Sequence, residues 1–329
     1  MAPSKLPSFL EPAEFVKQPE LLERKWTLEE SLAYTRWLST HHYENFHVVS
    51  FLLPKHLHQD FYNVYAFCRW ADDLGDEIGD TVECLRLLAW WRSLLYAGGG
   101  DSHPVFVALR PTMARRELPI QLFDDLIQAF EQDQVKTRYA NWDEVLRYCV
   151  NSANPVGRLV LGLCGYHDEA RGVLSDYTCT ALQLANFWQD VSVDIEKGRI
   201  YLPLDLLARH RVNEADILAR RHSEGFADAM REAVDYARDL FIKGLPLIPT
   251  LDRRLALDIE LFSQGGLAIL SKIEQQGYRV LDARPKISKS ERVMLLLRTI
   301  LHWSKNRIFS SQPLALPSSY DAPQPPRIP

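Results

Sequence analysis

The sequence predicts an all-α protein, and three features of the 329-residue chain support this fold class. Apolar residues recur at helical spacing in nearly every long segment, whereas the alternation typical of strands is almost absent. Helix-start signals, in which a capping side chain is followed three residues later by Glu, occur at Thr27, Asp80 and Asn141. With 47% hydrophobic and 25% charged residues, the chain can bury a sizeable core.

Helix breaks divide the chain without marking a domain linker. They are expected at Pro54, at residues 98–100, at Pro119, near Gly165, at Pro203 and around residues 246–249. One helical domain is therefore predicted over residues 25–308. Residues 1–24 are expected to form a partly ordered lead, and the Pro- and Ser-rich residues 309–329 a flexible tail.

Charge and composition exclude several classes of protein. A net charge of -5 without a basic stripe excludes general binding to nucleic acid. Apolar runs fall far short of the roughly 18 residues that cross a bilayer, and no secretory signal is evident, so a cytoplasmic location is expected. The cysteines are scattered and odd in number, which predicts reduced core residues rather than disulfides or a metal site: Cys68, Cys84, Cys149, Cys164 and Cys179.

Two segments gather polar residues on one helical face. The first face spans an arc of about 60° and holds Tyr65, Arg69, Asp72 and Asp76. The second spans about 80° and holds Gln183, Asn186, Asp190 and Asp194. Aspartates four residues apart also arise by chance on solvated helices, as Asp235 and Asp239 show. Unlike that pair, the first two pairs have polar companions and adjoin apolar runs, which indicates helices that line the core.

The two aspartate pairs predict a magnesium site. Carboxylates about 6 Å apart repel by roughly 3 kcal/mol at an effective dielectric of about 20, so apposed pairs need cations. Arg69, Lys197 and Arg199 offset part of this charge, and Mg²⁺ prefers oxygen ligands with room for water and phosphate oxygens. Mg²⁺ that bridges carboxylates to a diphosphate favours its departure and leaves a carbocation. The expected chemistry is therefore Mg²⁺-dependent ionisation of a prenyl diphosphate.

At these residues the chain resembles the squalene and phytoene synthase family, whose members carry Asp-x-x-x-Asp on each of two facing helices. Further matching segments are Phe46, Leu52-Leu53-Pro54, Tyr148, Val156-Gly157 and Arg199-Ile200-Tyr201-Leu202-Pro203. The resemblance implies a single-domain class I isoprenoid synthase bundle with a central active-site cavity.

The resemblance also implies roles for individual residues. The Mg²⁺ ligands would be Asp72, Asp76, Asp190 and Asp194, with Asn186 assisting. The substrate diphosphate would contact Arg69, Arg199, Asn45, Gln183 and His42. Tyr65 and Tyr148 would act in catalysis, and the cavity would also be lined by Phe46, Phe187, Tyr201 and Gln189, where aromatic faces stabilise a cation. The alternatives are core packing for the tyrosines, a helix-capping contact for Gln183 and a polar wall for the histidines.

Departures from the family pattern point to one branch. Tyr43-Glu44-Asn45 replaces a Ser-x-Ser pair, Asn154-Pro155 replaces Gly-Thr or Gly-Ser, and Gln189 stands where an Arg is usual. The loss of a basic residue and of small hydroxyl groups near the diphosphates favours a reaction that ionises one diphosphate over a reaction that joins two prenyl diphosphates. In these segments the chain is similar to the hydroxysqualene synthase branch of bacterial hopanoid biosynthesis.

The expected reaction is ionisation of presqualene diphosphate and capture by water, which gives hydroxysqualene. No nicotinamide cofactor is expected, since no Gly-x-Gly-x-x-Gly appears. The alternatives are condensation of two farnesyl diphosphates by a prenyltransferase, a non-catalytic binding or assembly protein, and a di-iron bundle, for which only Glu44 and His47 show the Glu-x-x-His spacing. A long apolar substrate is compatible with transient membrane-surface contact and with contacts to neighbouring enzymes of the squalene pathway, although no basic amphipathic helix is evident.

Overall fold

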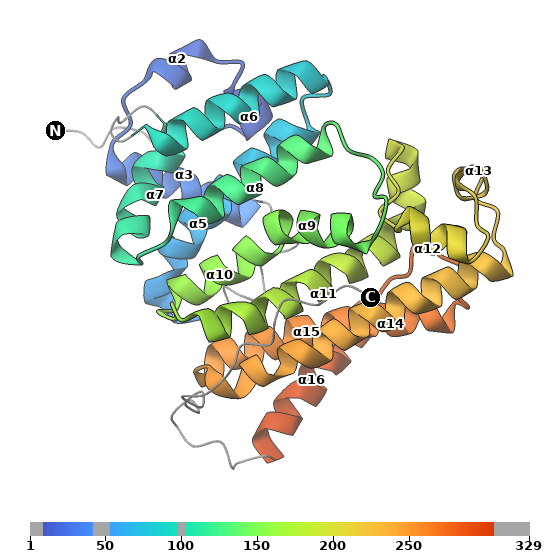
Figure 1. Ribbon diagram of the computed structural model, residues 1–329. Coiled ribbons are helices and arrows are strands. Elements are labelled where there is room, and N and C mark those ends of the chain that lie inside the picture. The colour runs from blue at the N-terminus through green and yellow to red at the C-terminus, as the bar shows by residue number, and fades with distance from the viewer. Residues whose placement is uncertain (1–8, 42–52, 98–102, 306–329) are drawn as a thin grey trace. The chain divides into compact units, whose positions relative to one another are not determined.

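A computed structural model describes residues 9–41, 53–97 and 103–305 of the chain (Figure 1). These ranges contain no strand, only an isolated bridge between Arg138 and Ile200, which confirms the all-α prediction. The chain divides into two compact units, Met1–Val135 with Leu159–Tyr166 (unit 1) and Lys136–Arg158 with His167–Pro329 (unit 2). The division falls within α10 (Asn154–Leu163). The domain bounds and the central cavity stay predictions, and the predicted tail at 309–329 lies outside the described residues.

The three helix-start signals are confirmed. Thr27 and Glu30 form a reciprocal capping box before α3 (Leu28–His41), because each backbone N–H donates to the other side chain, at 3.0 and 3.2 Å. Asp80 accepts from the Glu83 N–H at 2.8 Å before α6 (Thr81–Tyr96). Asn141 accepts from the Glu144 N–H at 3.1 Å before α9 (Trp142–Ser152). Local side-chain chemistry therefore fixes where these helices begin.

Unit 1 is built around α5 (His58–Asp76). This helix packs against α3, α6, α7 (Pro104–Arg115) and α8 (Ile120–Asp133) (Figure 1). The shorter elements of the unit are α1 (Pro12–Phe15), α2 (Pro19–Glu23) and η1 (Lys55–Leu57). In the core, the ring of Trp70 stacks on Trp91 at 5.0 Å between centroids and 8° between planes, and Phe67 meets Phe123 edge-on at 5.0 Å. One face of α5 is thus buried among aromatic rings.

A buried polar network fixes the rotation of α5. The Oδ1 of Asn63 accepts from the Thr35 hydroxyl at 2.7 Å, and its Nδ2 donates to the Ala108 carbonyl at 3.1 Å and to Thr112 at 3.0 Å. These bonds satisfy the amide inside the core, where an unpaired polar group would be costly. With Asn63, Phe67 and Trp70 turned inward, helical geometry directs Tyr65, Arg69, Asp72 and Asp76 to the opposite side.

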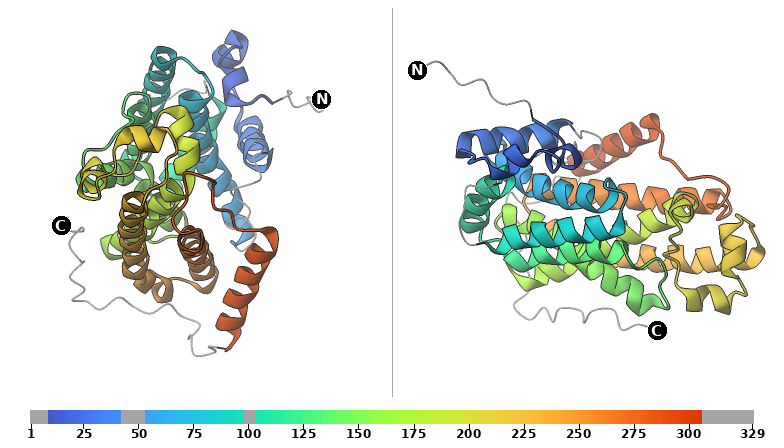
Figure 2. Two further views of the ribbon diagram at one scale, coloured as in Figure 1. Left: turned by 90° about the vertical axis from the view of Figure 1, so that its right-hand side faces the viewer. Right: turned by 90° about the horizontal axis from the view of Figure 1, so that it is seen from above.

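Unit 2 is built around the 26-residue helix α11 (Glu169–Asp194). It packs against α9, α14 (Glu224–Gly244) and α15 (Arg253–Gln275) (Figure 2). The remaining elements are η2 (Ile195–Lys197), α12 (Leu204–Arg209), α13 (Glu214–Leu218), η3 (Leu245–Thr250) and α16 (Lys289–Lys305). Trp188 of α11 donates its indole N–H to the Ala233 carbonyl of α14 at 3.0 Å. Close packing between α14 and α15 depends on Gly266, where a Cβ would lie 2.3 Å from the Phe241 ring.

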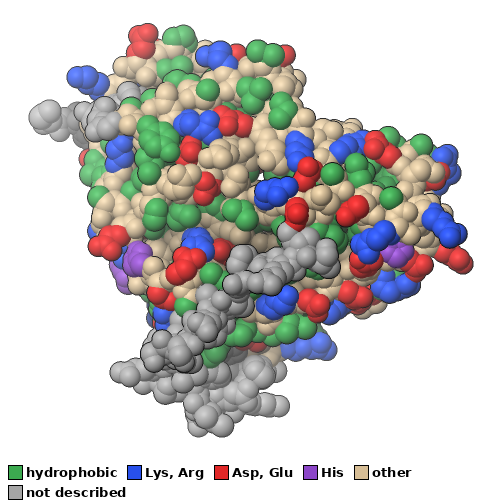
Figure 3. Space-filling model, in the orientation of Figure 1, with side chains coloured by type: hydrophobic (Ala, Val, Ile, Leu, Met, Phe, Trp, Pro, Cys, Tyr) green, Lys and Arg blue, Asp and Glu red, His purple; other side chains and the backbone are tan. Residues whose placement is uncertain are grey.

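Three predictions from composition concern the cysteines, the surface charge and membrane-spanning segments, and each can be compared with the described residues. All five cysteines are free thiols. On the face drawn in Figure 3, acidic and basic side chains are interspersed over the described part of the surface. None of the described helices combines the length and apolar character that a membrane crossing requires.

Candidate active site

The first aspartate pair lies at the C-terminal end of α5. Asp76 is the last residue of the helix and is exposed, and Asp72, one turn earlier, is half-buried. The last turn contains no basic residue. Since the C-terminal end of a helix carries a partial negative charge, each carboxylate here is disfavoured by about 0.3–1 kcal/mol. A cation bound at this end would relieve that cost.

Arg69 lies beside this pair and is held by Asp73. Its Nη2 is 2.5 Å from the Asp73 Oδ1, and its Nη1 donates to the Asp72 Oδ2 at 3.3 Å. The Asp73 side chain is only 4% exposed, against 46% for Asp72. The predicted diphosphate ligand Arg69 is therefore anchored from the core side, while Asp72 stays accessible. Asp73 was missed because its position falls off the polar arc.

Tyr65 lies one turn before Arg69 and is half-buried. Burial raises the pKa of its phenol. The positive charge of Arg69 lowers this pKa, and the carboxylates of Asp72 and Asp73 raise it further. Burial, reinforced by Asp72, also raises the pKa of the neighbouring Cys68 thiol to about 12. Both groups remain protonated at neutral pH, so Tyr65 can donate a hydrogen bond but cannot serve as a base.

The second aspartate pair lies at the C-terminal end of α11. Asp194 ends the helix, whose last turn again lacks a basic residue. Asp190, one turn earlier, pairs with both Nε and Nη2 of Arg284, and the Nη2–Oδ2 distance is 3.1 Å. The predicted cavity residue Gln189 donates to the Pro285 carbonyl at 2.7 Å. Adjacent residues of α11 thus hold the Arg284–Pro285 segment, and the contact of Arg284 with the predicted ligand Asp190 is one that the sequence did not reveal.

Gln183 and Asn186 share the α11 face with Asp190. Asn186 is exposed and Gln183 is half-buried. Their amide oxygens are hard donors of the type that Mg²⁺ accepts. Asn186 is thus open to a ligand.

Four aromatic residues form a buried cluster in unit 2. The rings of Phe187 and Tyr201 stack at 3.8 Å and 6°, and Tyr148 lies 5.8 Å from Phe187 and 6.0 Å from Tyr201. The structure therefore brings together these three residues, which the sequence had placed along the cavity wall. Tyr139 completes the cluster, stacked on Tyr201 at 5.5 Å, and was missed because it lies in a loop without a helical pattern.

The loop after α11 positions Arg199. Gly198 adopts a left-handed conformation with φ of 70°, which lets the Arg199 N–H return to the Asp194 carbonyl at 2.9 Å. The next residue, Ile200, donates to the Thr137 carbonyl at 3.0 Å. Arg199 is half-buried and lies next in sequence to the C-terminal end of α11 and η2, where a cation is electrostatically favoured.

The donor set fits Mg²⁺ in chemistry. Each unit offers oxygen donors of the kind that Mg²⁺ prefers: the carboxylates of Asp72 and Asp76 in unit 1, and the carboxylates of Asp190 and Asp194 with the amide oxygen of Asn186 in unit 2. Both pairs lie at the negative end of a helix. Within the described ranges no three His, Cys, Asp or Glu side chains are grouped closely enough to hold a metal ion. The remaining predicted residues, His42, Asn45 and Phe46, lie outside the described ranges.

Comparison with known proteins identifies the family. The squalene/phytoene synthase family model matches residues 39–291. Hydroxysqualene synthase of Rhodopseudomonas palustris is 35% identical over 265 residues, which cover 78% of this chain and 85% of that protein. Phytoene synthase of Thermus thermophilus is 32% identical over 290 residues, covering 87% and 96%.

Solved structures agree with this match. The crystal structure of squalene synthase HpnC from Alicyclobacillus acidocaldarius is 44% identical, with a TM-score of 0.73 over 76% of this chain and 95% of that one. A dehydrosqualene synthase at 24% identity shares the fold, with a TM-score of 0.74 over 84% of this chain and 98% of that one. The resemblance inferred from the aspartate motifs is confirmed, and the chain belongs to the squalene/phytoene synthase family.

Proposed function

We propose that this protein is a hydroxysqualene synthase, a carbon–oxygen lyase that ionises presqualene diphosphate and adds water. The observation that carries ionisation of a diphosphate is the pair of acidic helix ends, Asp72/Asp76 and Asp190/Asp194, whose last turns lack a basic residue. Bound Mg²⁺ would supply the positive charge that stabilises a departing diphosphate. At the negative end of a helix, the helix dipole and the carboxylates both attract such a cation.

Arg69 supplies a fixed positive charge to the diphosphate. The buried Asp73 orients its guanidinium. A preoriented cation stabilises charge that develops in the transition state without reorganising first. Tyr65, whose phenol stays neutral, can donate a hydrogen bond on the same side of α5.

The aromatic cluster suits the carbocation. The rings of Tyr148, Phe187 and Tyr201 are buried, and Phe187 and Tyr201 stack face to face. Aromatic rings stabilise a nearby positive charge, and a buried cluster of them would exclude bulk water. When the carbon–oxygen bond breaks, its electron pair stays on the diphosphate. The oxygen of one water molecule then bonds to the rearranged cation, and the proton released from that water goes to the diphosphate.

The relatives support the branch as well as the chemistry. Two proteins named hydroxysqualene synthase, from Rhodopseudomonas palustris and Zymomonas mobilis, are 35% identical over 265 residues and 36% identical over 203 residues, the latter covering 60% of this chain and 66% of that protein. The relative named phytoene synthase, at 32% identity, supports a second candidate, condensation of two prenyl diphosphates. Both reactions need the same acidic helix ends, so the products must discriminate between them.

Product analysis tests the proposal. Purified protein with Mg²⁺ should convert presqualene diphosphate to hydroxysqualene and should release no C30 product from farnesyl diphosphate alone, as measured by mass spectrometry. Formation of presqualene diphosphate or squalene from farnesyl diphosphate alone would instead favour condensation. Chelation of Mg²⁺ should abolish turnover, and added Mg²⁺ should restore it.

Two sets of variants test the assigned residues. Asp72→Asn and Asp190→Asn should each lower kcat by at least about 10²-fold, since each removes charge from a ligand to the metal. Asp235→Asn is the matched control, because Asp235 and Asp239 form an exposed pair on α14 with the same spacing. If Asp72→Asn and Asp190→Asn were as active as Asp235→Asn, the metal-ligand roles would be wrong, and absence of turnover by the wild type with either substrate would argue for a non-catalytic member of the family.

A further inference from the structure

Helix α16 presents four large apolar side chains to solvent. Val293 is 56% exposed, Met294 51%, Leu296 39% and Leu297 49%. They occupy two consecutive turns, so they form one continuous strip, which we call the α16 apolar strip. A continuous apolar strip of this kind on a helix surface usually marks a contact with a partner or a lipid.

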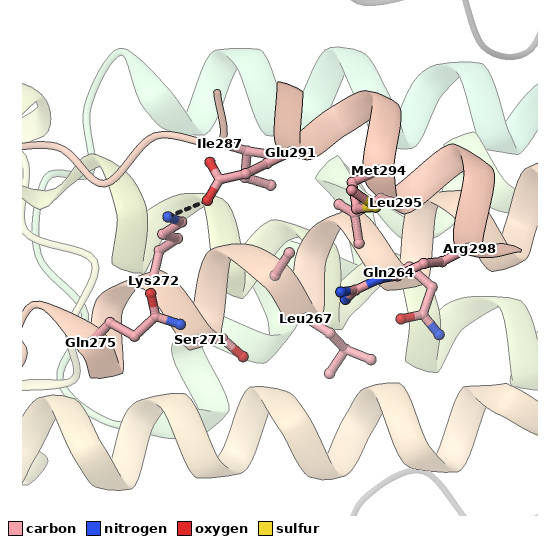
Figure 4. A pocket seen from close by; sticks show the side chains of 11 residues that line it. Gln264, Leu267, Ser271, Lys272, Gln275, Ile287, Glu291, Met294, Leu295 and Arg298 are labelled. Carbon is pink, nitrogen blue, oxygen red and sulfur yellow. Dashed lines mark ion pairs between the residues drawn. The ribbon is translucent and has the colours of Figure 1, made fainter. Parts of the chain in front are cut away.

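The opposite side of α16 is already used to hold the helix on unit 2. Glu291, Leu295 and Thr299, spaced four residues apart, are the less exposed residues, and Thr299 is 5% exposed. Glu291 pairs with Lys272 of α15 at 2.5 Å (Figure 4). At about 100° per residue, the α16 apolar strip spans roughly 160° on the side away from this seam. Met294, at one edge of the strip, also lines the groove between α16 and α15, whereas Val293, Leu296 and Leu297 do not line it.

A groove separates α16 from α15 beside the seam. It has a volume of about 430 Å³, with Leu267, Ile287 and Leu295 among its lining residues. Figure 4 shows the Lys272–Glu291 pair toward one end and Gln264 and Arg298 toward the other. The helix thus rests on α15 along a narrow line of contacts, which leaves its outer face free of packing by described residues.

Basic residues border the α16 apolar strip on both sides. By the same helical arithmetic, Arg292 lies about 40° beyond one edge and Arg298 about 40° beyond the other. Both are exposed, as is Lys289 at the start of the helix. The only acidic residue of α16 is Glu291, which faces inward and is neutralised by Lys272. The outer face is therefore apolar in the middle and cationic at its borders.

We infer that α16 docks this protein on an anionic lipid surface. An apolar arc with cationic borders and no outward acid is the pattern of a helix that lies in the membrane interface. The apolar strip would enter the boundary between headgroups and acyl chains, and the arginines would reach back to lipid phosphates. Lys289, at the start of the helix, is the one described charged residue of α16 that falls within the arc of the strip, about 20° inside the edge at Leu296, and its long side chain can extend toward lipid phosphates.

Charge also decides against two other occupants. A second copy using the same face would bring Arg292 and Arg298 against their own equivalents, which costs free energy. The chain's own residues 306–329 contain one acid, Asp321, against Arg307 and Arg327, so they offer no complementary charge. A lipid surface rich in phosphate matches both the apolar strip and its border.

Vesicle flotation of the whole protein without substrate tests the inference, so its result is independent of the reaction proposed above. The protein should float with phosphatidylcholine vesicles that contain about 30% phosphatidylglycerol, and much less with phosphatidylcholine alone. The double variant Val293→Gln with Leu297→Gln should lower the partition coefficient about tenfold or more, since two apolar side chains no longer enter the lipid. The matched control is Val150→Gln with Ile242→Gln, two residues of unit 2 that are 52% and 56% exposed.

A second variant tests the charged border. Arg292→Gln with Arg298→Gln should weaken binding to anionic vesicles and reduce its sensitivity to salt, because exposed charges are largely screened at about 1 M salt. Circular dichroism should show wild-type helix content in every variant. If the control pair weakens binding as much as the α16 pair, or if the wild type does not float, the inference is wrong. Sedimentation that shows a dimer dissolved by the α16 variant would assign the strip to a second copy instead.

Discussion

Asp72 and Asp73 are neighbours in sequence for which we predict opposite phenotypes. The Asp73 carboxylate is 4% exposed and lies 2.5 Å from Arg69, whereas Asp72 is 46% exposed and lies 3.3 Å from the same guanidinium. Removing one partner of a fully buried ion pair costs about 3–5 kcal/mol, and the partial exposure of Arg69, at 25%, lowers this to about 2–3 kcal/mol. Removing an exposed partner costs about 1 kcal/mol or less. Asp72→Asn also removes negative charge near the C-terminal end of α5, which offsets that cost.

Thermal unfolding and kinetics together separate the two roles. Asp73→Asn should lower the Tm by roughly 3–4 °C, because unfolding of a 329-residue chain carries an entropy of about 0.7 kcal/mol/K. Asp72→Asn should leave the Tm nearly unchanged and yet lose almost all turnover. The protein is assayed with Mg²⁺ and presqualene diphosphate, and the Tm is measured without either. If Asp73→Asn kept the wild-type Tm, or if Asp72→Asn unfolded the protein, the assignment of Asp73 as an anchor and Asp72 as a ligand would be refuted.

Three further predictions concern unit 2. Burial, assisted by Asp252, raises the pKa of Asp258 to about 8, so the folded protein holds a proton that the unfolded chain releases, and stability should fall as pH rises from about 4 to 8. Asp258→Asn should therefore raise the Tm relative to wild type by more at pH 8 than at pH 5, and an equal shift at both pH values would contradict this. Gly266→Ala should cost about 1–3 kcal/mol in urea unfolding, because its Cβ would meet Phe241, whereas Gly265→Ala, with nothing within 4 Å, should stabilise α15. Arg284→Gln should lower the half-saturating Mg²⁺ concentration by up to about fivefold, since the ion pair with Asp190 no longer competes; a rise would show that Arg284 assists binding instead.

The helical class and several helix starts were predictable because local chemistry determines them. Thr27, Asp80 and Asn141 cap their helices with side chains only three residues from the groups they bind. Helical periodicity likewise placed Tyr65, Arg69 and the aspartates of α5 on one face. These signals act within one or two turns, so a single sequence is enough to read them.

Contacts between distant segments could not be predicted in this way. Arg284 and Asp190 are 94 residues apart, and no spacing rule links them. Tyr139 joins the aromatic cluster from a loop, where periodicity carries no information. In α16, the run from Met294 to Leu297 gave no sign of an amphipathic helix, because the sequence does not show which apolar side chains face solvent. Which apolar side chains are buried depends on tertiary packing, and a periodic sequence pattern does not determine that packing.

Each aspartate helix carries a buried tryptophan two residues before its first motif aspartate. Trp70 precedes Asp72 and stacks on Trp91, and Trp188 precedes Asp190 and donates to Ala233. Both indoles are 0% exposed and lie in fixed, asymmetric surroundings. A movement of either helix on ligand binding would change ring overlap or the indole hydrogen bond, and with it the near-ultraviolet circular dichroism. The protein thus contains two intrinsic optical reporters, one for each helix, and replacing Trp70 or Trp188 by Phe in turn would show which helix responds.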